Sequence, residues 1–188
     1  PPPPPPPPPL DNLRRQRQMC IRDRLHDWRG VPFANDHLDA FFNAVGDAAI
    51  ALGAFVTAAE ASGLGCCPIS AVRNHAPAVS NLLGLPRHVF PFAGLAIGYP
   101  RRPPDIAMRL PLSSTCHVDK YDEVGVREAV ENYDTARAQS QPYAQRRLAE
   151  TFGTHGAYGW SEDKVRQYSV PERQNFGQYV RDRGFRLE

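Results

Sequence analysis

A run of small residues in the middle of the chain is the strongest local candidate for ligand binding. Residues 63–70 read Gly-Leu-Gly-Cys-Cys-Pro-Ile-Ser and follow a long apolar stretch. Small residues at a turn let backbone amides come close to a flat or anionic ligand. The run lacks the lysine of a phosphate-binding loop and the glycine spacing of a dinucleotide fold, so neither motif applies. A tight turn between a helix and a strand, with no ligand, is the alternative interpretation.

Arginines beyond this run could hold a phosphate or the polar edge of a planar ring. Arg109 follows a proline-rich loop that already contains Arg101 and Arg102, and Arg73 comes just after the small residues. A guanidinium held by a stiff loop suits such groups because it forms paired, charge-assisted hydrogen bonds. The alternatives are a solvated side chain for Arg109 and a structural salt bridge for Arg73.

Other site chemistries have little support in the sequence. The histidines are scattered, the adjacent Cys66 and Cys67 do not have metal-ligand spacing, and G-x-S-x-G is absent. We therefore expect no metal site and no serine hydrolase chemistry. We interpret the four cysteines as reduced thiols, which indicates a cytoplasmic protein.

Charge and hydropathy argue against nucleic acid and membrane partners. The formal net charge is +2, and residues 10–24 hold five Arg against two Asp, so the rest of the chain is nearly neutral. Such a surface cannot neutralise many phosphates. The longest uncharged apolar run, Ala48–Ala59, is shorter than the roughly 20 residues that span a bilayer.

The first 24 residues form a separate compositional segment. Pro1–Pro9 is an unbroken proline run, and a basic stretch follows it. Residues 18–24 read Gln-Met-Cys-Ile-Arg-Asp-Arg, which matches the translation of a transposon-end adapter used in sequencing libraries. We therefore predict a proline-rich, disordered and non-native leader over residues 1–24, and one domain over residues 25–188. A genuine basic arm is the alternative.

The remaining pattern predicts a mixed α and β domain whose elements position the candidate residues. Asn35 or Asp36 is expected to cap a long buried helix that runs to about Ser62, ends at Gly63 and is covered partly by another subunit. Residues 90–99 read as a central strand that is apolar on both faces. A short helix is expected after residue 75, with Pro77 in its first turn and Gly84 after its end. The other expected elements are a polar helix at 122–138, a mobile segment at 139–158, a helix capped by Ser161, a last helix from Pro171 to Gly184 and a terminal strand at 185–187.

Taken together, these residues resemble the nitroreductase superfamily, in the branch of the oxygen-insensitive NADPH nitroreductases and bacterial flavin reductases. The resemblance rests on order and spacing within Ala58–Tyr121. Its parts are Ala58-Ala59-Glu60, Gly63-Leu64-Gly65, Pro68-Ile69-Ser70, Arg73-Asn74, Leu82–Pro86, His88-Val89, Pro91, Gly94-Leu95, Gly98-Tyr99-Pro100, Arg109-Leu110-Pro111, His117 and Tyr121.

The resemblance implies an α/β (α+β) three-layer fold and a homodimer with FMN at the subunit interface. It implies that NAD(P)H reduces the flavin, which then reduces a nitroaromatic, a quinone, a flavin or a similar small-molecule acceptor. The flavin carries the redox chemistry in such enzymes, so no catalytic side chain is required.

The resemblance also assigns cofactor-binding positions. The flavin segment of the family falls on Pro68, Ile69, Ser70 and Ala71, of which only Ile69 is identical to the family residue. The family's lysine-proline-arginine element falls on Ala107, Met108 and Arg109, which keeps the arginine and loses the lysine. Arg73 is a further candidate. Arg146 and Arg147 lie in the loop that contacts the 2′-phosphate of NADPH in this branch.

The departure from the family lies at the N-terminus, where no counterpart of its arginine-serine-x-arginine motif for the FMN phosphate is found. We therefore expect an incomplete fold, a truncated fragment of a longer enzyme, and weak or absent FMN binding by the chain itself. The alternative is a non-catalytic, degenerate family member or a proline-rich interaction protein. The native upstream sequence would separate these readings.

Overall fold

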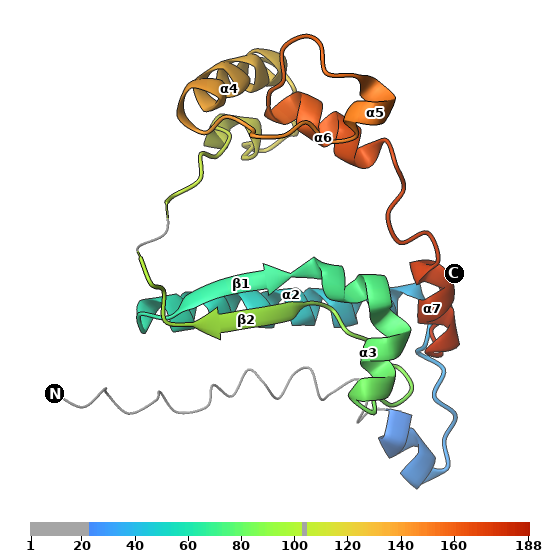
Figure 1. Cartoon of the computed structure of the whole chain (residues 1–188). Coiled ribbons are helices and arrows are strands. Elements are labelled where there is room, and N and C mark those ends of the chain that lie inside the picture. Colours follow the sequence, from blue (N-terminus) through green and yellow to red (C-terminus); the bar gives the residue numbers. More distant parts are fainter. Residues whose placement is uncertain (1–22, 103–104) are drawn as a thin grey trace, which may run out of the picture. The chain divides into compact units, whose positions relative to one another are not determined.

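The computed structural model describes residues 23–102 and 105–188, which form two compact units (Figure 1). Of the described residues, the first unit comprises 23–102 with Arg173–Glu188, and the second comprises 105–172. The leader predicted for residues 1–24 lies outside the described residues, except for Asp23 and Arg24. These two residues are helical together with residues 25–29, and the Asp23 carboxylate lies 3.0 Å from Nδ1 of the buried His88.

The long helix of the first unit is confirmed as α2, Leu38–Ala61. It ends just before Gly63, whose φ of 79° is the left-handed conformation that glycine adopts without strain. The predicted cap is wrong, because the residue before the helix is His37 and its side chain makes no capping hydrogen bond. The Asp36 carboxylate instead forms an ion pair with Arg186, near the other end of the chain, with 2.6 Å between Oδ1 of Asp36 and Nη2 of Arg186.

The sheet of this unit is smaller than the sequence predicts. Within the described residues it consists of β1, Gly65–Ile69, and β2, Gly94–Gly98, which pair antiparallel with Gly65 opposite Gly98 and Ile69 opposite Gly94. The strand expected over residues 90–99 is therefore wrong in extent. Pro91 has no N–H to donate to a ladder, which accounts for the late start of β2. The predicted burial of the strand on both faces is also wrong, since Ile97 is exposed.

The core of the first unit joins its two sequence segments. Helix α3, Ala76–Leu82, follows the short 3-10 helix η1, Ser70–His75, and lies against α7, Phe176–Asp182. Pro77 lies in the first turn of α3 and Gly84 follows its end, as predicted, whereas α7 begins later than Pro171. The predicted terminal strand is not formed; its first residue, Phe185, is instead buried in the core with Ala40, Ala76, Tyr179 and Val180.

Helix α2 is far more exposed than its composition predicts. Its buried residues are Ala40, Ala48 and Ala59, while Phe42 and Ile50 on the other side are 69% and 74% exposed. By length and composition alone α2 could cross a membrane, and only 11% of that apolar window is buried. The predicted burial of α2 is therefore wrong for the single chain, and its apolar face lacks a cover among the described residues.

The second unit is a small helical assembly. It contains η2, Leu112–Ser114, α4, Val126–Ser140, α5, Ala149–Phe152, and α6, Trp160–Tyr168. The predicted cap of α6 is wrong, because Gly159 precedes the helix and Ser161 lies within its first turn. Asp134, which lies on α4, caps the first turn of α6 instead. Its carboxylate accepts the Ser161 N–H at 3.0 Å and also the Ser161 hydroxyl.

We expect the substitution Asp134→Ala to lower the free energy of unfolding by about 1–2 kcal/mol, the usual loss when a helix cap is removed. The loss should be visible in urea denaturation followed by circular dichroism. Glu128→Ala, an exposed acid on the same helix, is the matched control and should cost less than about 0.5 kcal/mol. Equal effects of the two substitutions would contradict the capping role.

Candidate functional site

The segment assigned to the flavin lies where β1 passes into η1. Pro68 and Ile69 end the strand, and Ser70 and Ala71 begin η1. All four residues are exposed, so a ligand can reach them, although Pro68 and Ile69 are paired with β2. Gly94 pairs with Ile69, and a side-chain carbon at that glycine would lie 3.7 Å from Cβ of Ile69. The passage from β1 to η1 is therefore exposed, and Gly94 opposite Ile69 adds no side chain to it.

Arg73 lies at the end of this segment and faces into the unit. Its Nη1 donates to the carbonyl oxygen of Phe92 at 2.5 Å, which ties η1 to the chain leading into β2. Burial, together with the nearby Arg173 charge, lowers the pKa of Arg73. This contact is structural, and it differs from the salt bridge that the sequence left open.

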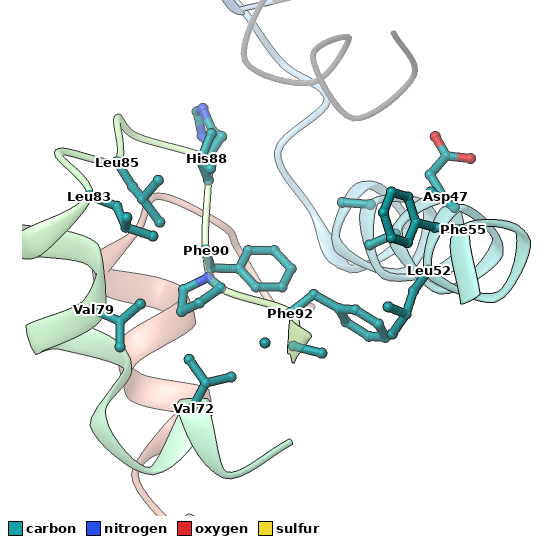
Figure 2. A pocket seen from close by; sticks show the side chains of 17 residues that line it. Asp47, Leu52, Phe55, Val72, Val79, Leu83, Leu85, His88, Phe90 and Phe92 are labelled. Atoms are coloured by element: carbon teal, nitrogen blue, oxygen red, sulfur yellow. The ribbon is translucent and has the colours of Figure 1, made fainter. Parts of the chain in front are cut away.

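The first unit also contains an apolar cavity of about 490 Å³ between α2 and the chain from α3 to β2 (Figure 2). Phe90 and Phe92 project into it from one wall and Leu52 faces them from α2. Asp47 and His88 are its titratable lining residues. None of the predicted cofactor residues lines this cavity, so it offers apolar volume and little to bind a phosphate.

Arg109 is exposed in the second unit, and the residue before it is tightly held. Tyr133 on α4 donates its hydroxyl to the Met108 carbonyl at 3.0 Å, and the Gln141 side chain accepts the Met108 N–H at 3.4 Å. Arg109 lines an open hollow with Glu128 of α4. Tyr133 and Gln141 therefore fix the backbone next to Arg109, while the Arg109 side chain remains accessible. The sequence did not reveal this role of Tyr133 and Gln141.

Arg146 and Arg147 are adjacent but differently engaged. Arg146 donates from both terminal nitrogens to backbone carbonyls, those of His155 at 2.9 Å and Gly156 at 2.7 Å. Its guanidinium also lies over the Tyr158 ring, 5.3 Å from the centroid. Arg147 instead directs Nε toward a carboxylate oxygen of Asp163, 3.4 Å away. The segment expected to be mobile is thus tied down by several hydrogen bonds.

Asp163 and Tyr158 form the centre of this cluster. The Tyr158 hydroxyl donates to an Asp163 carboxylate oxygen at 2.8 Å and accepts the backbone N–H of Arg147 at 2.8 Å. The Lys164 ammonium lies 3.3 Å from the other carboxylate oxygen of Asp163. Burial raises the pKa of Asp163, but the hydrogen bonds from Tyr158 and Lys164 and the charge of Arg147 outweigh burial and leave that pKa below its ordinary value. The carboxylate is therefore ionised at neutral pH.

Arg166 is a further, buried member of this cluster. It is 3% exposed, and its guanidinium donates to Glu162 at 2.7 Å and to the carbonyls of Arg147 and Gly153 at 3.1 and 3.0 Å. It also lies over the ring of Tyr158. A charged side chain with this many partners holds the loop of residues 146–158 against α6.

The predicted site residues fall into two groups. Pro68, Ile69, Ser70, Ala71 and Arg73 belong to the first unit, whereas Arg109, Arg146 and Arg147 belong to the second. Tyr133, Tyr158, Asp163 and Arg166, which position the second group, were missed. The Asp163 to Arg166 spacing places both on one side of α6, but a polar helix gives no periodic signal that such a side is buried. The described residues contain no cluster of three or more His, Cys, Asp or Glu suited to a metal ion.

Two sequence models of one family match the chain in order. Residues 7–99 match the model described as "Nitroreductase family", and residues 108–188 match "Nitroreductase family, C-terminal domain". Together they cover both compact units and the predicted cofactor residues in each.

Curated proteins and solved structures agree with these matches. The chain is 32% identical to an FMN reductase [NAD(P)H] of Bacillus subtilis, over 87% of this chain and 63% of the relative. It is 34% identical to an oxygen-insensitive NADPH nitroreductase of Salmonella typhimurium, over 64% of this chain and 47% of the relative. The structure of the hypothetical oxidoreductase YcnD from Bacillus subtilis has a TM-score of 0.77 and 26% identity, over 90% of this chain and 66% of that one. The chain thus spans less than two thirds of the length of these proteins.

Proposed function

The chain belongs to the nitroreductase family and has its mixed α and β fold, and we propose that it acts as an FMN-dependent NAD(P)H oxidoreductase. The observation that carries the proposal is the exposed turn from Ile69 to Ala71, at the place that family resemblance gives to the flavin. The acceptors proposed are nitroaromatics, quinones or flavins. The names of the relatives, an FMN reductase and an NADPH nitroreductase, support this class of reaction.

The residues present fit part of a flavin site. The exposed residues Ile69, Ser70 and Ala71 can contact a flat ring. Arg109 supplies a cation with an accessible surface for the polar edge or phosphate of the cofactor. FMN, when bound, supplies the transfer of hydride from NAD(P)H to the acceptor. The roles left to these residues are therefore binding and orientation.

We propose a homodimer built on α2 and a cytoplasmic location. The exposed face of α2 carries Phe42 and Ile50 with small residues between them, and space is open around Gly46 and Gly53. A small-residue face of this kind allows a second helix to approach closely. The family resemblance places FMN at the interface of such a dimer, so pairing of two chains and cofactor binding are proposed together.

The proposal is tested by mixing the purified chain with FMN in excess, since affinity is expected to be weak. NADPH or NADH is then added with a nitroaromatic, a quinone or further FMN as acceptor. We expect oxidation of the nucleotide above the rate without protein, and Arg109→Ala should raise the FMN concentration for half-maximal rate about tenfold, as the loss of one charge-assisted contact does.

Arg102→Ala, in the same proline-rich loop, is the matched control and should leave that concentration unchanged. A chain that oxidises neither nucleotide at saturating FMN would contradict the proposed activity and favour a non-catalytic family member. A change of similar size in both arginine variants would contradict the specific role of Arg109.

A further inference from the structure

The backbone just before Arg109 is fixed by hydrogen bonds from side chains. Ile106 and Met108 belong to no helix or strand, and the side chain of Ile106 is 93% exposed, so its packing contributes little. Gln141 donates from Nε2 to the Ile106 carbonyl at 3.3 Å, and its Oε1 accepts the Met108 N–H at 3.4 Å. The Tyr133 hydroxyl donates to the Met108 carbonyl at 3.0 Å. The place from which Arg109 extends therefore depends on two polar side chains.

Arg137 lies between these two side chains. Tyr133, Arg137 and Gln141 follow one another at intervals of four residues along α4 and past its C-terminal end, so they form one stripe. Nη1 of Arg137 donates to the Tyr133 hydroxyl and to Oε1 of Gln141, each at 3.4 Å. A guanidinium can only donate, whereas a hydroxyl and an amide can donate and accept. Arg137 therefore favours the orientations in which the Tyr133 proton and the Gln141 oxygen face the Met108 backbone.

The remaining surroundings of Arg137 do not explain the residue by themselves. Its guanidinium lies over the Tyr143 ring, 5.0 Å from the centroid. Its Nε is buried and has no hydrogen-bond partner within the described part of the chain, a cost that an apolar side chain would avoid. Arg137 also does not line the hollow beside Arg109. Any effect of Arg137 on a ligand in that hollow must therefore pass through its neighbours.

We propose that Arg137 is a positioning residue for Arg109. Through Tyr133 and Gln141 it holds the segment 106–108 in one conformation. Arg109 is thereby presented to the flavin before the cofactor arrives, and a guanidinium on a fixed backbone loses less conformational freedom on binding than one on a mobile segment. The inference rests on the proposed FMN-dependent function, and it adds a residue that the family resemblance does not assign.

The first measurement needs no cofactor. Hydrogen–deuterium exchange on the full chain reports the protection of the Met108 amide, which donates to Gln141. Arg137→Met keeps a long unbranched side chain without donors, and we expect it to speed exchange at Met108 about fivefold. Arg127→Ala, an exposed arginine on the same helix, is the matched control and should leave that exchange unchanged. Equal exchange in Arg137→Met and the unaltered chain would overturn the positioning role.

The second measurement is the dissociation constant of FMN, titrated into the full chain in excess and followed by quenching of flavin fluorescence. We expect Arg137→Met to raise this constant about fivefold and Arg109→Ala about tenfold. In the Arg109→Ala background, Arg137→Met should add less than about a further twofold, because the side chain that it positions is gone. Gln141→Met removes both hydrogen bonds to the segment and gives the same comparison if circular dichroism shows Arg137→Met to be poorly folded.

The outcomes separate this inference from the function on which it rests. A chain that does not bind FMN would contradict the proposed function, while exchange at Met108 still decides whether Arg137 holds the segment. Faster exchange with unchanged FMN affinity would overturn positioning for the cofactor. An equal loss of affinity in the unaltered and Arg109→Ala backgrounds would show that Arg137 supports the fold as a whole, which also overturns the inference.

Discussion

Replacing Arg166 with alanine is expected to destabilise the second unit by about 3 kcal/mol, the typical cost of removing a buried charged partner. The guanidinium satisfies Glu162 and the carbonyls of Arg147 and Gly153, and it packs over Phe152 and Tyr158. Alanine would leave these partly buried acceptors without their donors and a void between two rings. Chemical denaturation followed by circular dichroism measures the loss.

The chain contains a matched control for this prediction. Arg127 forms the same type of pair, four residues apart on a helix, with Glu131 at 3.0 Å, but its side chain is 93% exposed. An exposed pair contributes only about 0.3–0.5 kcal/mol, so Arg127→Ala should be nearly neutral. Arg166→Met, which keeps volume without donors, separates packing from hydrogen bonding. Similar small losses in Arg166→Ala and Arg127→Ala would show that burial of Arg166 contributes little.

The same helix shows why part of the site was not predictable from sequence. In α6 the acid and base Asp163 and Arg166 are buried, while the apolar Val165 is 64% exposed. Hydrophobic patterning assigns the opposite sides, because it treats charged residues as solvated. The partners that make burial of these charges tolerable lie in a loop with no periodic signal, so the sequence does not show them.

Prediction succeeded where the signal is local. Gly63 and Gly84 end α2 and α3 at residues that need positive φ, and Pro77 lies in the first turn of its helix. It failed where a partner comes from a distant segment. Asp36 binds Arg186 instead of capping α2, and the carboxylate at the start of α6 is Asp134 from another helix. A cap predicted from the residues next to a helix cannot take account of a partner from a distant segment.

The burial of α2 was also predicted wrongly for the single chain. The composition of α2 is that of a covered helix, yet its apolar face is exposed in the isolated chain. Composition reports the environment of a helix in the whole assembly, whereas the structure of one chain reports only the contacts within it. That difference points to a partner for α2 and sets up a direct test.

We expect the unaltered chain to have a solution mass of twice 20.9 kDa, and Ile50→Asp to convert it to the single-chain mass. Ile50 is 74% exposed on the face opposite Ala48, so the single chain tolerates a charge there. In a twofold dimer each substitution occurs twice, and two like charges meet in an apolar contact. A cost of about 4 kcal/mol would weaken the dimer roughly 1000-fold. Light scattering coupled to size-exclusion chromatography measures the mass.

Leu82→Asp is the matched control, because Leu82 is also a large apolar residue, 84% exposed, but lies on α3. It should leave the dimer intact. Vesicle sedimentation distinguishes the remaining explanation of the apolar helix, since a chain that inserts α2 into a bilayer would pellet with lipid. A single-chain mass for the unaltered protein, or equal dissociation by both substitutions, would remove α2 as the dimer contact, and with it the reason to place a flavin site between two chains.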